Sequence, residues 1–65
     1  MYKVITKSKY HTATEVYKAF GNIPQRIRVI KDTGVSMSQA TFNYASWVRE
    51  IKPEEITEII IKFED

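Results

Sequence analysis

The chain has 65 residues, of which 43% are hydrophobic and 28% are charged, and it contains two glycines, two prolines and no cysteine. A chain this short is expected to form one domain, which spans residues 1–65. The composition excludes disulfides and thiolate metal sites, and the single histidine, His11, provides no ligand cluster. We therefore expect no cofactor. Self-association is the stabilising device that remains for so small a core, which predicts a homodimer.

Charge divides the chain into a basic body and an acidic end. Residues 1–52 carry nine basic and three acidic side chains, whereas residues 53–65 carry one basic and five acidic side chains. Such an asymmetry steers a polyanion towards one part of the surface, although a merely solvated surface is the alternative. The longest run of uncharged apolar residues is Ile59–Ile61, which is far too short to span a membrane. We therefore expect a cytoplasmic protein with no membrane contact.

Strands are predicted at both ends of the chain. Residues 2–6 and 56–63 are rich in β-branched and aromatic residues, with partial alternation of apolar and polar positions. We expect them to pair antiparallel, with charged residues of the second segment facing Lys3 and Lys7. Opposite charges in such pairs contribute only a few tenths of a kcal/mol each, and Lys62 opposite a lysine would cost about as much.

Helical periodicity occurs three times between these strands. A capping box opens residues 12–20, where apolar residues fall at i, i+3, i+4 and i+7 before Gly21. A proline opens residues 24–33, and Gly34 ends this second helix. A second capping-box spacing precedes residues 37–51, which carry the third apolar stripe. The predicted fold class is α+β, with three short helices closed by a two-stranded antiparallel sheet from the N- and C-terminal segments.

The titratable residues do not form a catalytic set. His11 is alone in a predicted surface turn, and the chain has no thiol nucleophile. Glu54 and Glu55 are adjacent, so their side chains point apart. The two glycines are predicted at helix ends and do not form a phosphate-binding loop. We expect a binding protein rather than an enzyme, with no small-molecule substrate.

The segment around Gly34 has the pattern of a helix-turn-helix. Gly34 is expected to take a left-handed conformation and Val35 to fill the angle between two helices. Such a corner would project the polar start of the third helix towards DNA bases, with basic residues beside it. A three-helix domain with an ordinary polar face is the alternative. The predicted base contacts are Met37, Ser38, Gln39, Thr41, Phe42 and Asn43, and the predicted phosphate contacts are Arg26, Arg28, Lys31, Ser36 and Arg49.

Short motifs between the leading and trailing strands resemble the small phage repressors of the lambda Cro type. These motifs are Tyr17-Lys18-Ala19-Phe20-Gly21, Lys31-Asp32-Thr33-Gly34-Val35-Ser36, and Ser38-Gln39-Ala40 followed by Asn43. The resemblance implies a small dimer whose third helix enters the major groove of an operator and blocks transcription, one helix per half-site. It assigns the exposed positions of that helix to Met37, Ser38, Thr41 and Phe42, and the buried ones to Ala40 and Tyr44.

Two functions follow from these patterns. The first is a sequence-specific, double-stranded DNA-binding regulator of transcription that acts as a repressor. The second is a small modulator or inhibitor of a host protein, because Phe42 would be exposed on the third helix unless a partner covered it. That partner would bind the face formed by Met37, Phe42, Ala45 and Arg49.

Overall fold

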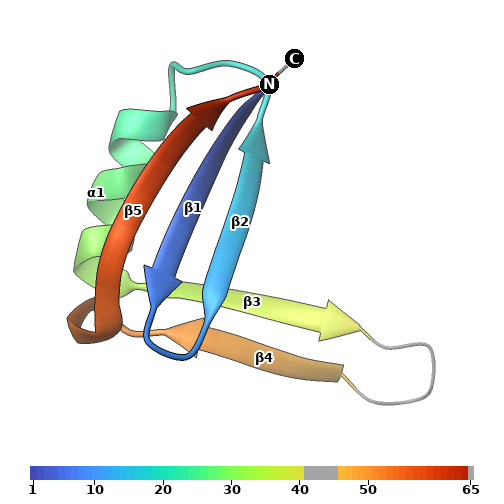
Figure 1. The fold of residues 1–65 in the computed structure, drawn as a ribbon, viewed down its shortest axis with the longest axis vertical. Helices are drawn as coiled ribbons and strands as arrows, with labels where there is room; N and C mark the ends of the chain where they lie inside the picture. The colour runs from blue at the N-terminus through green and yellow to red at the C-terminus, as the bar shows by residue number, and fades with distance from the viewer. Residues whose placement is uncertain (41–45, 65) are drawn as a thin grey trace.

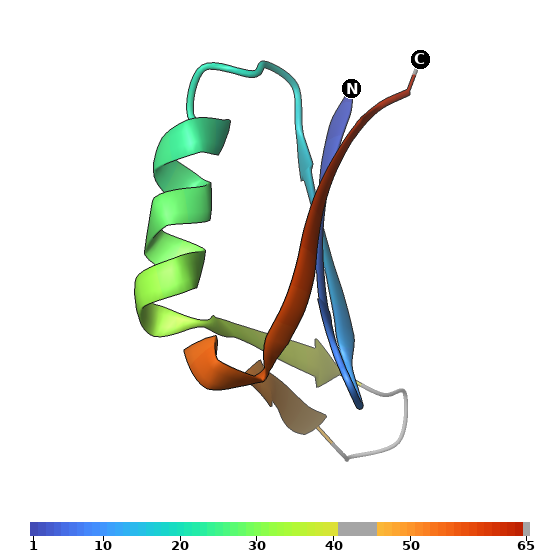
Figure 2. The same ribbon diagram turned by 60° about the vertical axis from the view of Figure 1, so that its left-hand side comes forward.

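A three-stranded antiparallel sheet, one α-helix on one of its faces and a separate two-stranded ribbon make up the computed structural model of the protein (Figure 1). It describes the backbone of residues 1–40 and 46–64 and the side chains of residues 1–36 and 50–64. Figure 2 shows the helix on one side of the sheet and the ribbon at one end of it. The elements in chain order are β1 (Tyr2–Ser8), β2 (Thr12–Tyr17), α1 (Ile23–Thr33), β3 (Val35–Ala40), β4 (Ser46–Ile51), the short 3-10 helix η1 (Pro53–Glu55) and β5 (Ile56–Phe63).

β1 is the central strand of the sheet and pairs antiparallel with both β2 and β5. The prediction that the two end segments pair antiparallel is therefore confirmed. Lys7 lies opposite Glu58, but Lys3 lies opposite Lys62, so one cross-strand pair joins like charges. Glu64 offsets part of this repulsion, because its Oε2 lies 2.8 Å from the Nζ of Lys3.

α1 is the second predicted helix; it starts one residue before the predicted Pro24 and ends at Thr33 as predicted. Pro24 lies in the first turn, where its missing N–H leaves no hydrogen bond unmade. Ile23 and Ile30 are fully buried and Ile27 is half-buried, so the isoleucine stripe packs on the core. The helix ends where the N–H of Gly34 donates to the carbonyl of Ile30 at 2.8 Å.

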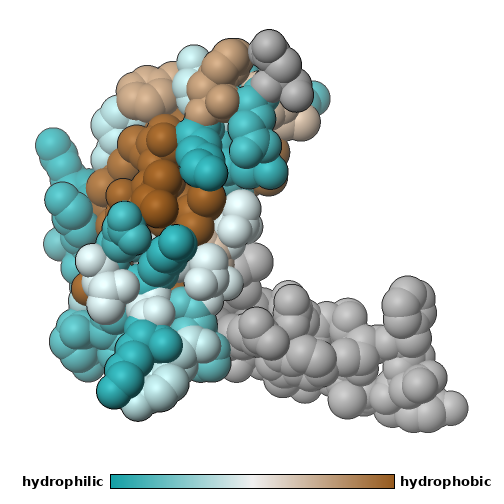
Figure 3. All heavy atoms as spheres, viewed as in Figure 1, coloured by the Kyte–Doolittle hydropathy of each residue, from teal (hydrophilic) through white to brown (hydrophobic). Residues whose placement is uncertain are grey.

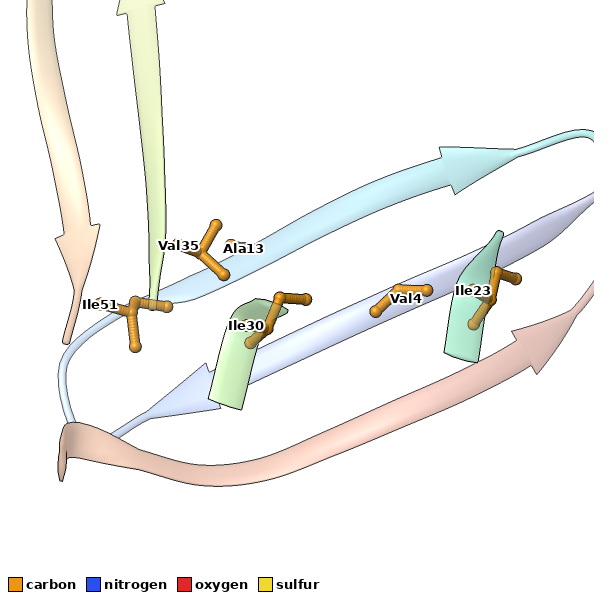
Figure 4. Packing of buried hydrophobic residues seen from close by; sticks show 6 residues of the cluster. All are labelled: Val4, Ala13, Ile23, Ile30, Val35 and Ile51. Carbon is orange, nitrogen blue, oxygen red and sulfur yellow. The ribbon is translucent and has the colours of Figure 1, made fainter. Parts of the chain in front are cut away.

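The hydrophobic core lies between α1 and the sheet and continues to the base of the ribbon (Figure 4). Its buried apolar residues come from β1, β2, α1, β3 and β4, and are Val4, Ala13, Ile23, Ile30, Val35 and Ile51. β5 adds only the half-buried Ile56 and Ile59. The edge of the sheet at β5 is therefore less completely covered than its centre.

The hydroxyl of Thr6 is buried in this core, and it has no hydrogen-bond partner among the side chains and backbone groups that the structure describes. An unpaired buried hydroxyl costs about 1–3 kcal/mol. We expect Thr6→Val to raise the free energy of unfolding by about 1 kcal/mol, measured by urea denaturation. Thr14→Val is the control, because Thr14 is exposed. A loss of stability in the Thr6 variant alone would contradict the prediction.

The helix predicted at residues 12–20 is wrong, because residues 12–17 form β2. Burial alternates along the strand, with Ala13 buried between the exposed Thr12 and Thr14. Glu15 does not close a capping box and instead accepts hydrogen bonds from the side chain of Arg26. The β-branched residues of the segment fit a half-buried strand, and pairing with β1 satisfies its backbone, which outweighs the matching helical spacing.

The third helix predicted at residues 37–51 is also wrong, and the helix-turn-helix is absent with it. Residues 35–40 and 46–51 are instead strands β3 and β4, paired antiparallel from Val35 opposite Ile51 to Ala40 opposite Ser46. The predicted fold class of three helices and a two-stranded sheet is therefore corrected to one helix, a three-stranded sheet and a ribbon. Serine and β-branched residues have low helix propensity, so the helix was weakly supported by local preference.

Gly34 takes the positive φ that was predicted for it, with a value of 78°. The residue connects α1 to β3 and is itself buried. A Cβ atom at this position would overlap the backbone carbonyl oxygen of Ile51 and would also lie close to the ring of Pro53. Glycine is thus required both by the backbone conformation and by the close approach of the end of β4.

Candidate nucleic-acid interface

The β3–β4 ribbon leaves the body of the protein almost at once. Its first residue pair, Val35 and Ile51, is anchored in the core, with exposed fractions of 3% and 1%. The next pair, Ser36 and Glu50, is already exposed. β3 and β4 form a sheet of their own and extend past the three-stranded sheet (Figure 1). The chain therefore turns at Gly34 and carries the following segment away from the body, as a strand and not as a helix.

The residues predicted to contact bases fall on this ribbon or between its strands. Met37, Ser38 and Gln39 belong to β3, where Met37 lies opposite Arg49 and Gln39 lies opposite Trp47. The other three predicted base contacts lie outside the described residues, and they are Thr41, Phe42 and Asn43. The ribbon also contains two of the predicted phosphate contacts, Ser36 in β3 and Arg49 in β4.

Two further predicted phosphate contacts, Arg28 and Lys31, are exposed on α1. Lys31 lies in the last turn of the helix, three residues before Gly34, which connects α1 to β3. A cation there also interacts favourably with the negative end of the helix dipole. The fold thus places two exposed cations on the helix that leads directly into the ribbon.

Arg26 has a different environment from Arg28 and Lys31. Its Nε donates to both carboxylate oxygens of Glu15 on β2, at 3.2 and 3.0 Å, and its Nη2 lies 3.0 Å from Oε2. The hydroxyl of Tyr17 donates to the same Oε2 at 3.2 Å. We assign Arg26 to joining α1 to β2. The predicted phosphate set near the ribbon is then reduced to Arg28, Lys31, Ser36 and Arg49.

The pKa values in this cluster reflect burial and charge. Burial is the largest cause that raises the pKa of the Tyr17 hydroxyl above its ordinary value, and the nearby Glu15 carboxylate is the second. The hydrogen bond to Glu15 is the largest cause that raises the pKa of Arg26. Both shifts favour the protonated forms of Tyr17 and Arg26, which are the forms that donate hydrogen bonds to Glu15.

Two lysines were not included among the predicted contacts although they lie near the ribbon. Lys52 is exposed and directly follows β4. Lys9 is exposed in the turn between β1 and β2, and its Nζ lies 5.5 Å from the centre of the Tyr10 ring. Figures 1 and 2 show this turn at the end of the sheet where the ribbon also lies. Lys52 lies next to the base of β3 because its neighbour Ile51 pairs with Val35, and only the tertiary fold brings the turn that carries Lys9 to the same end of the sheet.

Other kinds of site are not found in the part of the chain that the structure describes. It contains no group of three or more histidine, cysteine or acidic side chains that could hold a metal ion. None of its helices is long and apolar enough to cross a membrane. The chain matches no protein-family model, and no curated protein or solved structure is significantly similar to it.

Proposed function

We propose that the protein binds double-stranded DNA with the β3–β4 ribbon and acts in the cytoplasm as a sequence-specific regulator of transcription. The observation that carries this proposal is the projection of the ribbon. Its base is held by the buried Val35 and Ile51, and the rest extends past the sheet (Figure 1).

The dimensions of the ribbon suit the major groove of B-DNA. That groove is about 12 Å wide and admits either an α-helix or a two-stranded β-ribbon. Six residues of β3, at about 3.3 Å each, span roughly 20 Å and can follow the groove over several base pairs. β-Ribbon proteins read base edges in this way without any helix-turn-helix. The loss of the third helix therefore removes the predicted reading element but not the predicted function.

The composition of β3 suits contact with base edges. It contains Ser36, Ser38 and Gln39, whose side-chain types donate and accept hydrogen bonds, and it contains no acidic residue. Glutamine is one of the two residue types that recognise adenine through its N6 and N7 atoms. The ribbon therefore carries residue types that can distinguish base pairs.

Exposed cations beside the ribbon supply the contacts with phosphate. Arg28 and Lys31 precede the ribbon in the chain, and Lys52 follows it. Acidic Glu64 lies next to Met1 at the opposite end of the sheet, where the amino group of Met1 donates to its carbonyl at 2.6 Å. The Lys3 ammonium, whose Nζ lies 2.8 Å from Oε2 of Glu64, lowers the pKa of the Glu64 carboxyl.

The salt dependence of duplex binding tests this proposal. The experiment is a fluorescence anisotropy titration with a pool of labelled random duplexes in roughly 50 mM and 200 mM salt. If about four phosphates are neutralised, the affinity falls about 150-fold between the two conditions. A flat salt response, or no binding in either condition, would contradict DNA binding and favour the protein-partner function.

Matched lysine variants locate the contact on the protein. We expect Lys31→Gln to weaken binding to all sequences alike and to reduce the salt slope by about 1. Lys18→Gln is the control, because Lys18 is also exposed but follows β2 at the end of the sheet away from the ribbon. Gln39→Ala is expected to relax the preference at one base pair and to leave the salt slope unchanged. Equal effects of the two lysine variants would show that the ribbon is not the interface.

A further inference from the structure

Among the residues that the structure describes, the outer edge of β5 has no strand paired with it. In the strand order β2-β1-β5, β1 is the one described strand that pairs with β5, and Figure 2 shows no other described element along the outer side of β5. The strand is eight residues long and contains three consecutive isoleucines, Ile59 to Ile61. Figure 3 shows apolar surface in this region of the sheet, between hydrophilic residues. A long, apolar, unpaired edge is a template for pairing with another strand, and natural proteins normally protect it.

The side of β5 that faces α1 is also incompletely covered. Ile61 lies opposite the buried Val4, and Phe63 lies opposite Tyr2, so both are on the helix-facing side of the sheet. Nevertheless, Ile61 is 39% exposed and Phe63 is 62% exposed. A groove lined in part by Ile27 of α1 and residues 56–59 runs beside the first half of the strand. A neighbouring strand would cover these apolar groups.

We infer that β5 pairs antiparallel with β5 of a second copy of this chain, about a two-fold axis at Ile60. In this register Ile59 lies opposite Ile61 of the second copy, and Thr57 lies opposite Phe63. The exposed Ile61 and Phe63 of each copy thus enter the groove beside β5 of the other copy. This inference rests on the sheet edge and does not depend on DNA binding.

Charge complementarity selects this register. With the axis at Ile60, Glu58 of each copy lies opposite Lys62 of the other, which makes two opposite-charge pairs. Within one copy Lys62 faces Lys3 across the sheet, so the second copy supplies a carboxylate that Lys62 lacks in the β1–β5 pairing. An axis at Ile61 would instead place Glu58 opposite Glu64 of the other copy. An axis at Ile59 would place Glu58 opposite the apolar Ile60.

The resulting dimer has a continuous six-stranded sheet. Because the two-fold axis is normal to the sheet, both copies of α1 lie on the same face. The ribbons leave opposite ends of the sheet, and within each copy the ribbon extends towards the β2 side, away from the β5 edge (Figure 1). The ribbon therefore does not obstruct the pairing.

A single cysteine at the axis tests the pairing directly, because the natural chain has no cysteine. Residues opposite each other in antiparallel strands have Cα atoms about 4.5–5.5 Å apart, which a disulfide can bridge. We expect Ile60→Cys to form a covalent dimer under mild oxidation. Val16→Cys, at an exposed position on the other edge strand, is the control and is expected to stay uncrosslinked. Failure of the Ile60 variant to crosslink, or equal crosslinking of both variants, would overturn the inference.

Charge exchange tests the register without relying on oxidation. Sedimentation equilibrium should show a dimer of the natural chain, and Glu58→Lys or Lys62→Glu alone should weaken it about tenfold or more. An equimolar mixture of the two single variants should restore dimers, because each variant then faces its opposite charge. Circular dichroism of each variant checks that the fold is retained. A natural chain that stays monomeric at high micromolar concentration, or a mixture that does not associate, would contradict the β5 pairing.

Discussion

Gly34→Ala is expected to lower the free energy of unfolding by more than about 3 kcal/mol. Two costs combine at this position. The φ of 78° disfavours any side chain, and a Cβ atom would overlap the carbonyl oxygen of Ile51, which is a backbone atom that cannot rotate away. The same overlap would push the end of β4 away from the start of β3. We therefore expect the variant to lose both stability and the anchored base of the ribbon.

Gly21→Ala is the matched control for this prediction. A Cβ atom at Gly21 would have no heavy atom within 4 Å. Replacing glycine at such a position reduces the entropy of the unfolded chain and is expected to change stability by less than about 1 kcal/mol, in the favourable direction. Urea denaturation followed by circular dichroism measures both variants. Similar midpoints for the two variants would show that the connection between α1 and β3 is not as tight as described.

Ile30→Ala is expected to destabilise the fold by about 2–5 kcal/mol, the usual cost of truncating a large buried aliphatic side chain. Ile30 is 0% exposed and belongs to the cluster that includes Val35 and Ile51 at the base of the ribbon. Removing its side chain would leave a cavity where the helix, the sheet and the ribbon meet. In a chain of this size such a loss is a large part of the total stability.

Val29→Ala provides the comparison from the adjacent residue of the same helix. Val29 is 40% exposed, and alanine has the higher helix propensity, so the expected loss is below about 1 kcal/mol. Thermal and urea denaturation of the two variants measure the difference. A comparable loss in both would mean that the face of α1 carrying Ile30 does not pack on the core.

Several elements were predicted because local and tertiary preferences agree in them. The isoleucines of α1 recur at helical spacing between a proline and a glycine, and the same spacing buries Ile23 and Ile30. β1 and β5 combine β-branched composition with positions at the two ends of the chain, and they pair as expected. Gly34 was identified because a turn between two regular elements so often requires a positive φ.

The segment in which the base contacts were predicted has a different secondary structure from the one expected, because it forms strands and not a helix. Residues after Gly34 do extend from the body, which the turn at this glycine indicated. Their conformation could not be read from spacing, because apolar positions in residues 36–51 fit a helical stripe while the composition also suits strands. The ion pair that distinguishes Arg26 from Arg28 and Lys31 could not be predicted from the sequence either, because Glu15 comes close to Arg26 only when its segment forms β2.

The sequence of neighbouring residues thus determined α1, the two terminal strands and the glycine that precedes the ribbon. Each of these depends on neighbouring residues, through helical spacing, β-branched runs or the conformational freedom of glycine. Contacts between distant residues decided the rest. β2 is a strand because β1 pairs with its backbone, and β3 and β4 are strands because each pairs with the other. The free energy of strand pairing depends on two segments coming together. It therefore cannot be inferred from the spacing of apolar residues in either segment alone.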